Sequence, residues 1–231
     1  MQRTRIKICG LTRPADVQAA VALGADALGF VFYPASPRHV TPEQARALIA
    51  LVPPFINTLG LFVNASVEQV LAVTNMAPLS MLQFHGDESA AHGAALAGAA
   101  NRPYMQVFRV KPDTVAADLI ECERVCRAAS TLFSGLLLDT HVDAFGGAGK
   151  VFDWSVIPEE LAPRVVLSGG LSVLNTTEAV LRVRPYAVDI SSGVEASRGI
   201  KDARKISAFI KAVRDADTLI QKETSHDQLN E

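Results

Sequence analysis

The chain has 231 residues, 49% hydrophobic and 20% charged, so it can bury a substantial core and lies in the size range of one barrel domain. Its formal net charge of −2 is spread without a basic block, which argues against nucleic acid as a partner. No apolar run approaches the roughly 18 residues of a membrane span, and no apolar leader precedes the first strand, so we expect a cytoplasmic location and no membrane partner.

Eight short apolar segments, rich in β-branched residues, recur along the chain and predict strands. Their ends recur every 22 to 31 residues, and they span residues 6–9, 27–32, 58–63, 81–85, 105–110, 135–140, 165–168 and 187–191. Helix signals lie between most of them. Two are capping boxes, Thr41-Pro42-Glu43-Gln44 and Ser66-Val67-Glu68-Gln69. Three further residues are candidate N-caps: Asp87, Asp113 and Ser172.

The last predicted helix carries an apolar stripe at i, i+3, i+4 and i+7 that would cover the outside of a sheet, formed by Ile206, Phe209, Ile210 and Val213. Eight strand-helix repeats of this size predict an α/β fold with a single (β/α)8 TIM barrel over residues 1–217, because an open doubly wound sheet more often has five or six strands. Residues 218–231 are expected to form a polar C-terminal tail.

The three cysteines argue against a disulfide framework, because their number is odd in a chain of this length. Cys122 and Cys126 lie four residues apart in a predicted helix, and no histidine or second cysteine pair completes a ligand set around them. We therefore predict no metal site.

In a barrel, function lies in the loops that follow the C-terminal ends of the strands. Strands seven and eight end in the glycine-rich turns Ser168-Gly169-Gly170 and Ser191-Ser192-Gly193. Glycine lets backbone N–H groups approach an anion closely, and the N-terminus of a following helix adds its dipole. One such turn is a weak signal, but two turns after adjacent strands predict a phosphorylated ligand.

A third glycine-rich run, at residues 146–150, does not fit a nucleotide-binding loop. Ala144 stands where a Walker A glycine is needed, and Val151 replaces the serine or threonine that follows the lysine. We interpret this run as a mobile lid.

Strand alternation places Lys7 and Cys9 on the inner face of the first strand, and Leu137 and Asp139 on the inner face of the sixth. Cys9 and Asp139 then converge on the mouth of the barrel. A buried cysteine is most often a small hydrophobic residue. A buried aspartate is costly unless it is paired or functional. We therefore predict a functional role for Asp139 more firmly than for Cys9.

Three further polar residues are candidates for the site, and the first two have alternative interpretations. His85 shares a strand face with Gln83, which fits either a hydrogen-bonded core pair or a ligand contact. Arg38 follows Pro37 in a proline-rich loop, where it is either solvated or placed to bind a carboxylate through two parallel hydrogen bonds. Asp189 faces inward from the eighth strand, and we predict that it balances the charge of Lys7 on the neighbouring first strand.

Taken in order, several short motifs resemble phosphoribosylanthranilate isomerase of tryptophan biosynthesis over roughly residues 5 to 215. They are Lys7-Ile8-Cys9-Gly10, Ser36-Pro37-Arg38, Gln83-Phe84-His85-Gly86, residues 146–150 with Phe152-Asp153-Trp154, Ser168-Gly169-Gly170-Leu171, and residues 189–195. Two departures are small: Ala148 stands where family members commonly carry a hydroxyl residue, and Phe84 where they often carry leucine. The alanine bears only on a side-chain contact from the lid.

The resemblance implies an Amadori rearrangement of N-(5′-phosphoribosyl)anthranilate to 1-(2-carboxyphenylamino)-1-deoxyribulose 5-phosphate, without cofactor or metal. Asp139 would be the general acid and Cys9 the general base. The substrate would be bound by Arg38 at its carboxylate, by the turns at Gly169, Gly170, Ser192 and Gly193 at its phosphate, and through His85 and Asp189. The only partner implied is this small phosphoribosyl molecule, and no obligate protein partner is evident.

Two alternatives stay open at this stage. The related aminoaldose isomerase of histidine biosynthesis, or a dual-substrate enzyme, performs the same rearrangement on a similar barrel, but with a carboxylate where this chain has Cys9. A non-catalytic barrel that only binds a phosphosugar would not need both Cys9 and Asp139. The thiol favours the tryptophan enzyme, and a turnover assay with both substrates would decide.

Overall fold

The computed structural model describes residues 3–141 and 151–227, and in it eight parallel strands close into a barrel. The strands pair in sequence order, and β8 returns to pair with β1. Their bounds are β1 Arg5–Cys9, β2 Ala27–Val31, β3 Asn57–Phe62, β4 Met81–Phe84, β5 Tyr104–Val110, β6 Phe133–Thr140, β7 Val166–Leu167 and β8 Ala187–Ile190. The predicted fold is confirmed, and each strand begins and ends within two residues of its predicted position.

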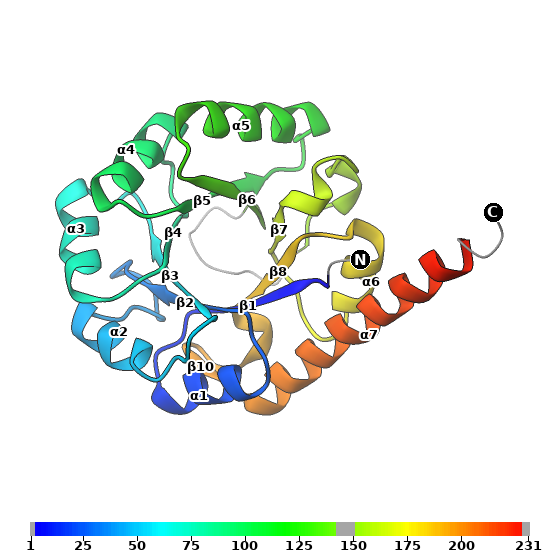
Figure 1. The fold of residues 1–231 in the computed structure, drawn as a ribbon, viewed down its shortest axis with the longest axis horizontal. Coiled ribbons are helices and arrows are strands. Elements are labelled where there is room, and N and C mark those ends of the chain that lie inside the picture. The colour runs from blue at the N-terminus through cyan, green and yellow to red at the C-terminus, as the bar shows by residue number, and fades with distance from the viewer. Residues whose placement is uncertain (1–2, 142–150, 228–231) are drawn as a thin grey trace.

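The helices surround the barrel as an outer ring (Figure 1). They are α1 Pro14–Ala22, α2 Pro42–Ile49, α3 Val67–Met76, α4 Ala90–Ala100, α5 Ala116–Ala129, α6 Thr176–Val183 and α7 Ala203–Asp227. Between β6 and β7 the described residues form two short 3-10 helices, Trp154–Val156 and Ala162–Arg164, in place of the α-helix that eight regular repeats would require. After β8 a third one, Ser192–Val194, leads into a two-stranded hairpin of β9 Glu195–Ser197 and β10 Ile200–Lys201.

The helix caps show where local sequence is sufficient. Both predicted capping boxes form: the Thr41 and Ser66 hydroxyls accept hydrogen bonds from the N3 amides of α2 and α3. The three other predicted N-caps are wrong, because α4, α5 and α6 begin after Ser89, Val115 and Asn175. At α4 the predicted cap, Asp87, is instead bound by the Arg109 guanidinium and by the Asn64 side chain. A tertiary partner thus outcompetes the local cap.

Two layers of apolar side chains flank the strands, as strand alternation predicts. Outward-facing residues such as Ile8 and Leu138 pack against the helices, whereas Leu137 belongs to an inner cluster that fills the barrel. The predicted stripe on α7 is buried in the outer layer. Each such side chain contributes roughly 1.5–3 kcal/mol through removal from water. The barrel is therefore a packed scaffold that fixes the directions of the polar residues at its mouth.

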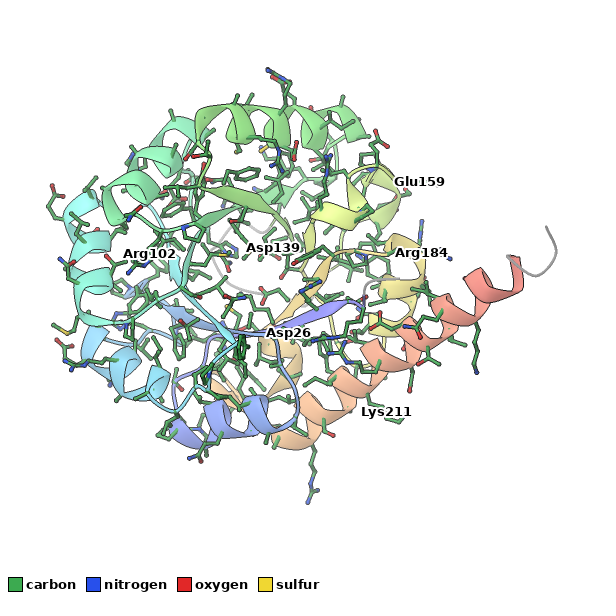
Figure 2. All side chains as sticks on the ribbon, in the orientation of Figure 1. Asp26, Arg102, Asp139, Glu159, Arg184 and Lys211 are labelled. Carbon is green, nitrogen blue, oxygen red and sulfur yellow. The ribbon has the colours of Figure 1, made fainter. Side chains whose placement is uncertain are left out.

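Helix α7 crosses the predicted domain boundary at residue 218 and continues to Asp227, and Ile220 on it is buried. The division into a catalytic barrel and a polar tail remains a prediction. Residues 218–227 of the predicted tail are helical. No helix in the described part of the chain combines the length and apolar character needed to span a bilayer. Charged side chains such as Lys211 on α7 and Arg184 directly after α6 lie on the outside of the ring, whereas Asp139 lies inside it (Figure 2).

Candidate active site

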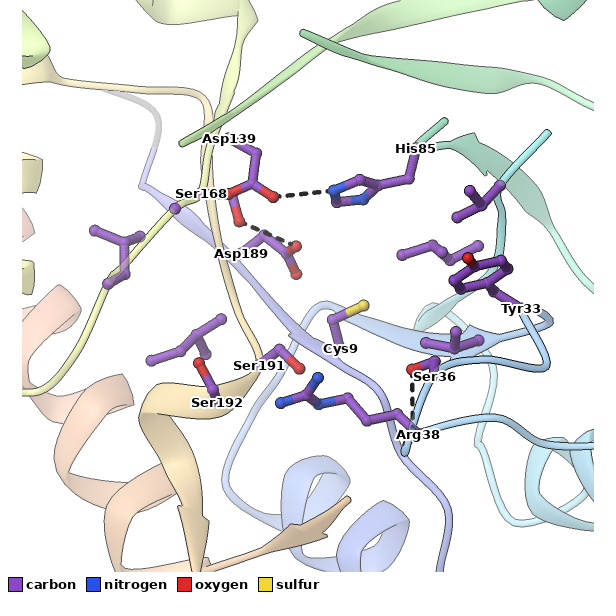
Figure 3. Close-up of a pocket in the computed structure, with 16 residues that line it drawn as sticks. Cys9, Tyr33, Ser36, Arg38, His85, Asp139, Ser168, Asp189, Ser191 and Ser192 are labelled. Atoms are coloured by element: carbon purple, nitrogen blue, oxygen red, sulfur yellow. Dashed lines mark hydrogen bonds and ion pairs between the residues drawn. The ribbon is translucent and has the colours of Figure 1, made fainter. Parts of the chain in front are cut away.

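A cavity opens at the C-terminal ends of the barrel strands, where the loops converge (Figure 3). It is lined from β1, β2, β3, β4, β6, β7 and β8 or from the loops that follow them. Seven of the residues predicted for the site line it: Cys9, Arg38, His85, Asp139, Gly169, Asp189 and Ser192. Gly170 and Gly193 are their chain neighbours in the loops after β7 and β8, but they do not line the cavity themselves.

The Asp139 carboxyl group is part of a hydrogen-bonded chain that crosses the mouth. His85 Nε2 lies 2.9 Å from Asp139 Oδ2, and His85 Nδ1 lies 3.0 Å from Gln83 Nε2. The other carboxylate oxygen accepts a hydrogen bond from the Thr140 amide at 2.8 Å. The predicted pair of His85 and Gln83 is confirmed, and His85 also lines the cavity, where a ligand contact stays a prediction. The contact with Asp139 was not predicted.

The Cys9 thiol lies at the base of the cavity, only 4% exposed, against Val31 and Leu61. Gly29 on β2 makes room for it, because a Cβ atom there would lie 2.7 Å from Sγ. Burial raises the pKa of the Cys9 thiol, and the neighbouring Lys7 ammonium opposes that increase only in part. The thiol is therefore held mainly in its neutral form until a further positive charge approaches.

Lys7 and Asp189 form a buried ion pair beneath the cavity, with Nζ 2.8 Å from Oδ1. The two residues are register partners on β1 and β8, which the closed barrel brings together. Burial alone would lower the pKa of Lys7, but Asp189 and Cys9 together outweigh it and the net pKa is raised. The predicted charge balance is confirmed. Removal of one partner from such a pair costs roughly 3–5 kcal/mol, so this pair also anchors the closure between β1 and β8.

Arg38 extends from the loop after β2, past Gly10 directly after β1, to the loop after β8. Its Nε and Nη2 atoms donate to the two oxygens of Glu195 at 2.7 and 2.9 Å. Glu195 also accepts from the Lys201 ammonium group at 2.9 Å. Glu195 and Lys201 were not singled out from the sequence, because Arg38 and Glu195 lie in loops after β2 and β8, and strand order does not fix the paths of loops. The only feature of the sequence that could have pointed to Glu195 is its position, two residues after the glycine-rich turn of strand eight.

The glycine-rich turns after β7 and β8 pack against neighbouring backbone and leave no room for side chains. Gly169 and Gly170 have φ values of +81° and +67°, which favour glycine. A Cβ atom on Gly193 would lie 2.2 Å from the Leu171 carbonyl oxygen, so the two loops lie directly on each other. The Asn175 side chain holds the first loop by donating to the Gly170 carbonyl at 3.1 Å.

Replacement of Gly169 by alanine should destabilise the protein by roughly 1–3 kcal/mol and reduce turnover. The new Cβ would lie 2.4 Å from Thr140 Oγ1 and 3.0 Å from Asp139 Oδ1, at a positive φ. Urea unfolding and steady-state kinetics measure the two effects. Gly98→Ala in α4 is the matched control, because nothing lies within 4 Å of its Cβ position and alanine favours a helix. Equal behaviour of the two variants would contradict this prediction.

The predicted lid at residues 146–150, together with Ala144 and Ala148, lies outside the described residues. It stays a prediction.

Taken together, the closed barrel and the reactive side chains at its C-terminal mouth define an enzyme of the (β/α)8-barrel class. A sequence model of one such family, described as N-(5′-phosphoribosyl)anthranilate (PRA) isomerase, matches residues 6–212. The chain belongs to this family. It is therefore an isomerase of tryptophan biosynthesis, as the motifs predicted.

Individual relatives agree with this assignment. The chain is 62% identical over 221 residues to the N-(5′-phosphoribosyl)anthranilate isomerase of Herminiimonas arsenicoxydans, covering 96% of this chain and 97% of that one. It is 50% identical to the enzyme of the same name from Ralstonia pickettii, over 95% and 97% of the two chains. The crystal structure of phosphoribosyl anthranilate isomerase from Thermotoga maritima superimposes with a TM-score of 0.80 at 39% identity, covering 91% of this chain and 98% of that one.

A further similar structure is a phosphoribosyl anthranilate isomerase in complex with reduced 1-(o-carboxyphenylamino)-1-deoxyribulose 5-phosphate. It superimposes with a TM-score of 0.74 at 35% identity, covering 91% of this chain and 98% of that chain.

Proposed function

We propose that the chain converts N-(5′-phosphoribosyl)anthranilate to 1-(2-carboxyphenylamino)-1-deoxyribulose 5-phosphate by general acid–base catalysis, with Asp139 as the acid and Cys9 as the base. One observation carries this proposal: the thiol and the carboxyl group line the same cavity, between an arginine and the glycine-rich turns. A related enzyme binds the reduced form of this product, which supports the substrate class.

In the first step, Asp139 donates a proton to the ring oxygen of the ribose. The bond between that oxygen and C1′ breaks, and the lone pair of the anilino nitrogen forms a C1′=N iminium ion. Asp139 must therefore carry a proton when it acts. The contact between its Oδ2 and His85 Nε2 at 2.9 Å fixes the direction of the carboxyl group at the mouth.

In the second step, the Cys9 thiolate removes the proton from C2′. The electrons of the C–H bond form a C1′=C2′ double bond, the nitrogen regains its lone pair, and the resulting enolamine tautomerises to the ketone. The iminium ion supplies the positive charge that a buried thiol requires, since nearby cations favour thiolate. The Lys7 ammonium acts in the same direction. The base is thus activated by the product of the first step.

The substrate is anchored at both ends of the cavity. We assign its phosphate to the backbone N–H groups of the turns at Gly169–Gly170 and Ser192–Gly193, and its carboxylate to Arg38. Asp189 contributes from below, where it holds Lys7 next to Cys9. All of these groups belong to one chain, which supports a site that needs no obligate protein partner. A thiol base also requires a reducing compartment, which supports the predicted cytoplasmic location.

The test is a turnover assay that follows the loss of substrate fluorescence, with the histidine-pathway aminoaldose as a second substrate. We expect turnover of the anthranilate compound and little of the other. A barrel that only binds phosphosugars would turn over neither. Comparable rates on both substrates would replace the proposal with a dual-substrate enzyme.

Substitution of Arg38 by alanine should raise KM by about tenfold or more and change kcat much less, because a charge-assisted pair to a carboxylate contributes mainly to binding. Steady-state kinetics over a wide range of substrate concentrations separate the two constants. Arg124→Ala is the control, since Arg124 is bonded to Glu121 on the outer surface of α5. A fall in kcat with an unchanged KM would contradict the binding role.

A further inference from the structure

Glu195 occupies one edge of the Arg38 guanidinium group at the mouth of the barrel. We propose that Glu195, with its charge balanced by Lys201, is a positioning residue that fixes Arg38 to receive the anthranilate carboxylate. This inference rests on the proposed function of Arg38 as the carboxylate ligand. The side chains of Arg38, Glu195 and Lys201 are 12%, 6% and 0% exposed, so the cluster is almost closed to water.

The hydrogen-bond pattern leaves a defined half of the guanidinium group for the substrate. Glu195 takes the edge formed by Nε and Nη2. The remaining edge, Nη1 with the second hydrogen of Nη2, has no hydrogen bond to any residue of 3–141 or 151–227, and Arg38 lines the cavity. Figure 3 shows its guanidinium group reaching toward Ser191. A planar guanidinium carries five donors, so two carboxylates can bind it side by side.

Lys201 resolves the electrostatic problem that this arrangement creates. An arginine already neutralised by one buried carboxylate would attract a second carboxylate only weakly. Burial lowers the pKa of Lys201, and the contact with Glu195 at 2.9 Å opposes that decrease; with Lys201 protonated, the three-residue cluster has a net charge of +1. Burial alone would raise the pKa of Glu195, but its hydrogen bonds to Arg38 and Lys201 lower it overall, so the glutamate stays ionised. Because Lys201 balances the charge of Glu195, the positive charge of Arg38 can attract the carboxylate of the ligand.

The cluster is also held rigidly. Glu195 and Lys201 are register partners across the β9–β10 hairpin. Lys201 Nζ donates to the Ser191 carbonyl at 3.0 Å, and the Lys201 amide donates to Asp16 at 3.0 Å. On the opposite side, Gly10 lies so close to the Arg38 stem that a Cβ there would be 2.4 Å from Cδ. The guanidinium group is therefore confined between β1 and the hairpin.

The experiment compares two inhibitors that differ only in the carboxylate. One is reduced 1-(o-carboxyphenylamino)-1-deoxyribulose 5-phosphate, and the other is the same compound with an unsubstituted phenyl ring. Inhibition constants are measured for wild type, Glu195→Gln, Arg38→Met and the double variant Glu195→Gln/Lys201→Met. The double variant avoids a buried cation without a partner, in case the single variant does not fold. Glu121→Gln is the control, because Glu121 accepts the same two hydrogen bonds from Arg124 on the surface.

We expect Glu195→Gln and the double variant to weaken binding of the carboxylated inhibitor by about tenfold or more, and binding of the phenyl inhibitor by less than about twofold. Glu121→Gln should change neither. If Arg38→Met removes the preference for the carboxylate while both Glu195 variants retain it, the positioning role is wrong and the proposed function stands. Equal weakening of both inhibitors would also overturn the positioning role. If Arg38→Met keeps the full preference, the carboxylate site itself is wrongly assigned, and this inference falls with it.

Discussion

Replacement of Asp139 by asparagine is expected to lower kcat by at least about 100-fold. The amide has nearly the shape of the carboxyl group and can still contact His85, but it cannot transfer a proton to the ring oxygen. The furanose ring then opens only through protonation by water. Steady-state turnover, followed through the loss of substrate fluorescence, measures the effect.

Asp87→Asn provides the matched control for this substitution. Asp87 is an exposed carboxylate in the loop after β4, bound to Arg109, and it does not line the cavity. Its replacement should leave kcat within about twofold of wild type, because exposed ion pairs contribute little. Thermal unfolding of both variants separates loss of fold from loss of chemistry. Near-normal turnover by a folded Asp139→Asn enzyme would remove the carboxyl group from the mechanism.

The contacts of this site that can be predicted from the sequence are those that the barrel topology fixes. The ion pair between Lys7 and Asp189 could be predicted, because alternation sets the inner face of each strand and closure makes β8 the neighbour of β1. The same rules bring Cys9 and Asp139 to the mouth. Such contacts follow from periodicity and strand order alone, without knowledge of any loop.

Contacts that depend on loop paths or side-chain reach could not be predicted in the same way. His85 follows β4 and Asp139 is the penultimate residue of β6, so the two are not on adjacent strands, and their bond depends on side chains that reach past β5. Lys201 reads in the sequence as a polar residue before a helix. Only the β9–β10 hairpin turns it inward onto Glu195. The 3-10 helices between β6 and β7 likewise lack a periodic signal.

Replacement of Cys9 by alanine is expected to lower kcat by at least about 100-fold, because no other group would remove the C2′ proton. Cys126→Ala is the matched control, since Cys126 is equally buried but lies on α5, away from the cavity. Its loss should affect stability and not turnover. If a folded Cys9→Ala enzyme turns over at a rate close to that of wild type, the thiol is a packing residue.

The pH dependence gives an independent test of the thiol, because a general base acts only when it has lost its proton. Turnover needs Cys9 without its proton and Asp139 with one, so the profile has two limbs, one for each group. Burial raises the pKa of Cys9 in the free enzyme, so the limb of the kcat/KM profile that belongs to Cys9 should lie above about pH 8.5, the ordinary pKa of a cysteine. In the substrate complex the iminium ion favours thiolate, so the corresponding limb of kcat should lie at lower pH. In a Cys9→Asp variant this limb should move to lower pH in both profiles, since a carboxyl group ionises more readily than a thiol. Profiles that are identical in wild type and Cys9→Asp would assign the titrating base to another residue.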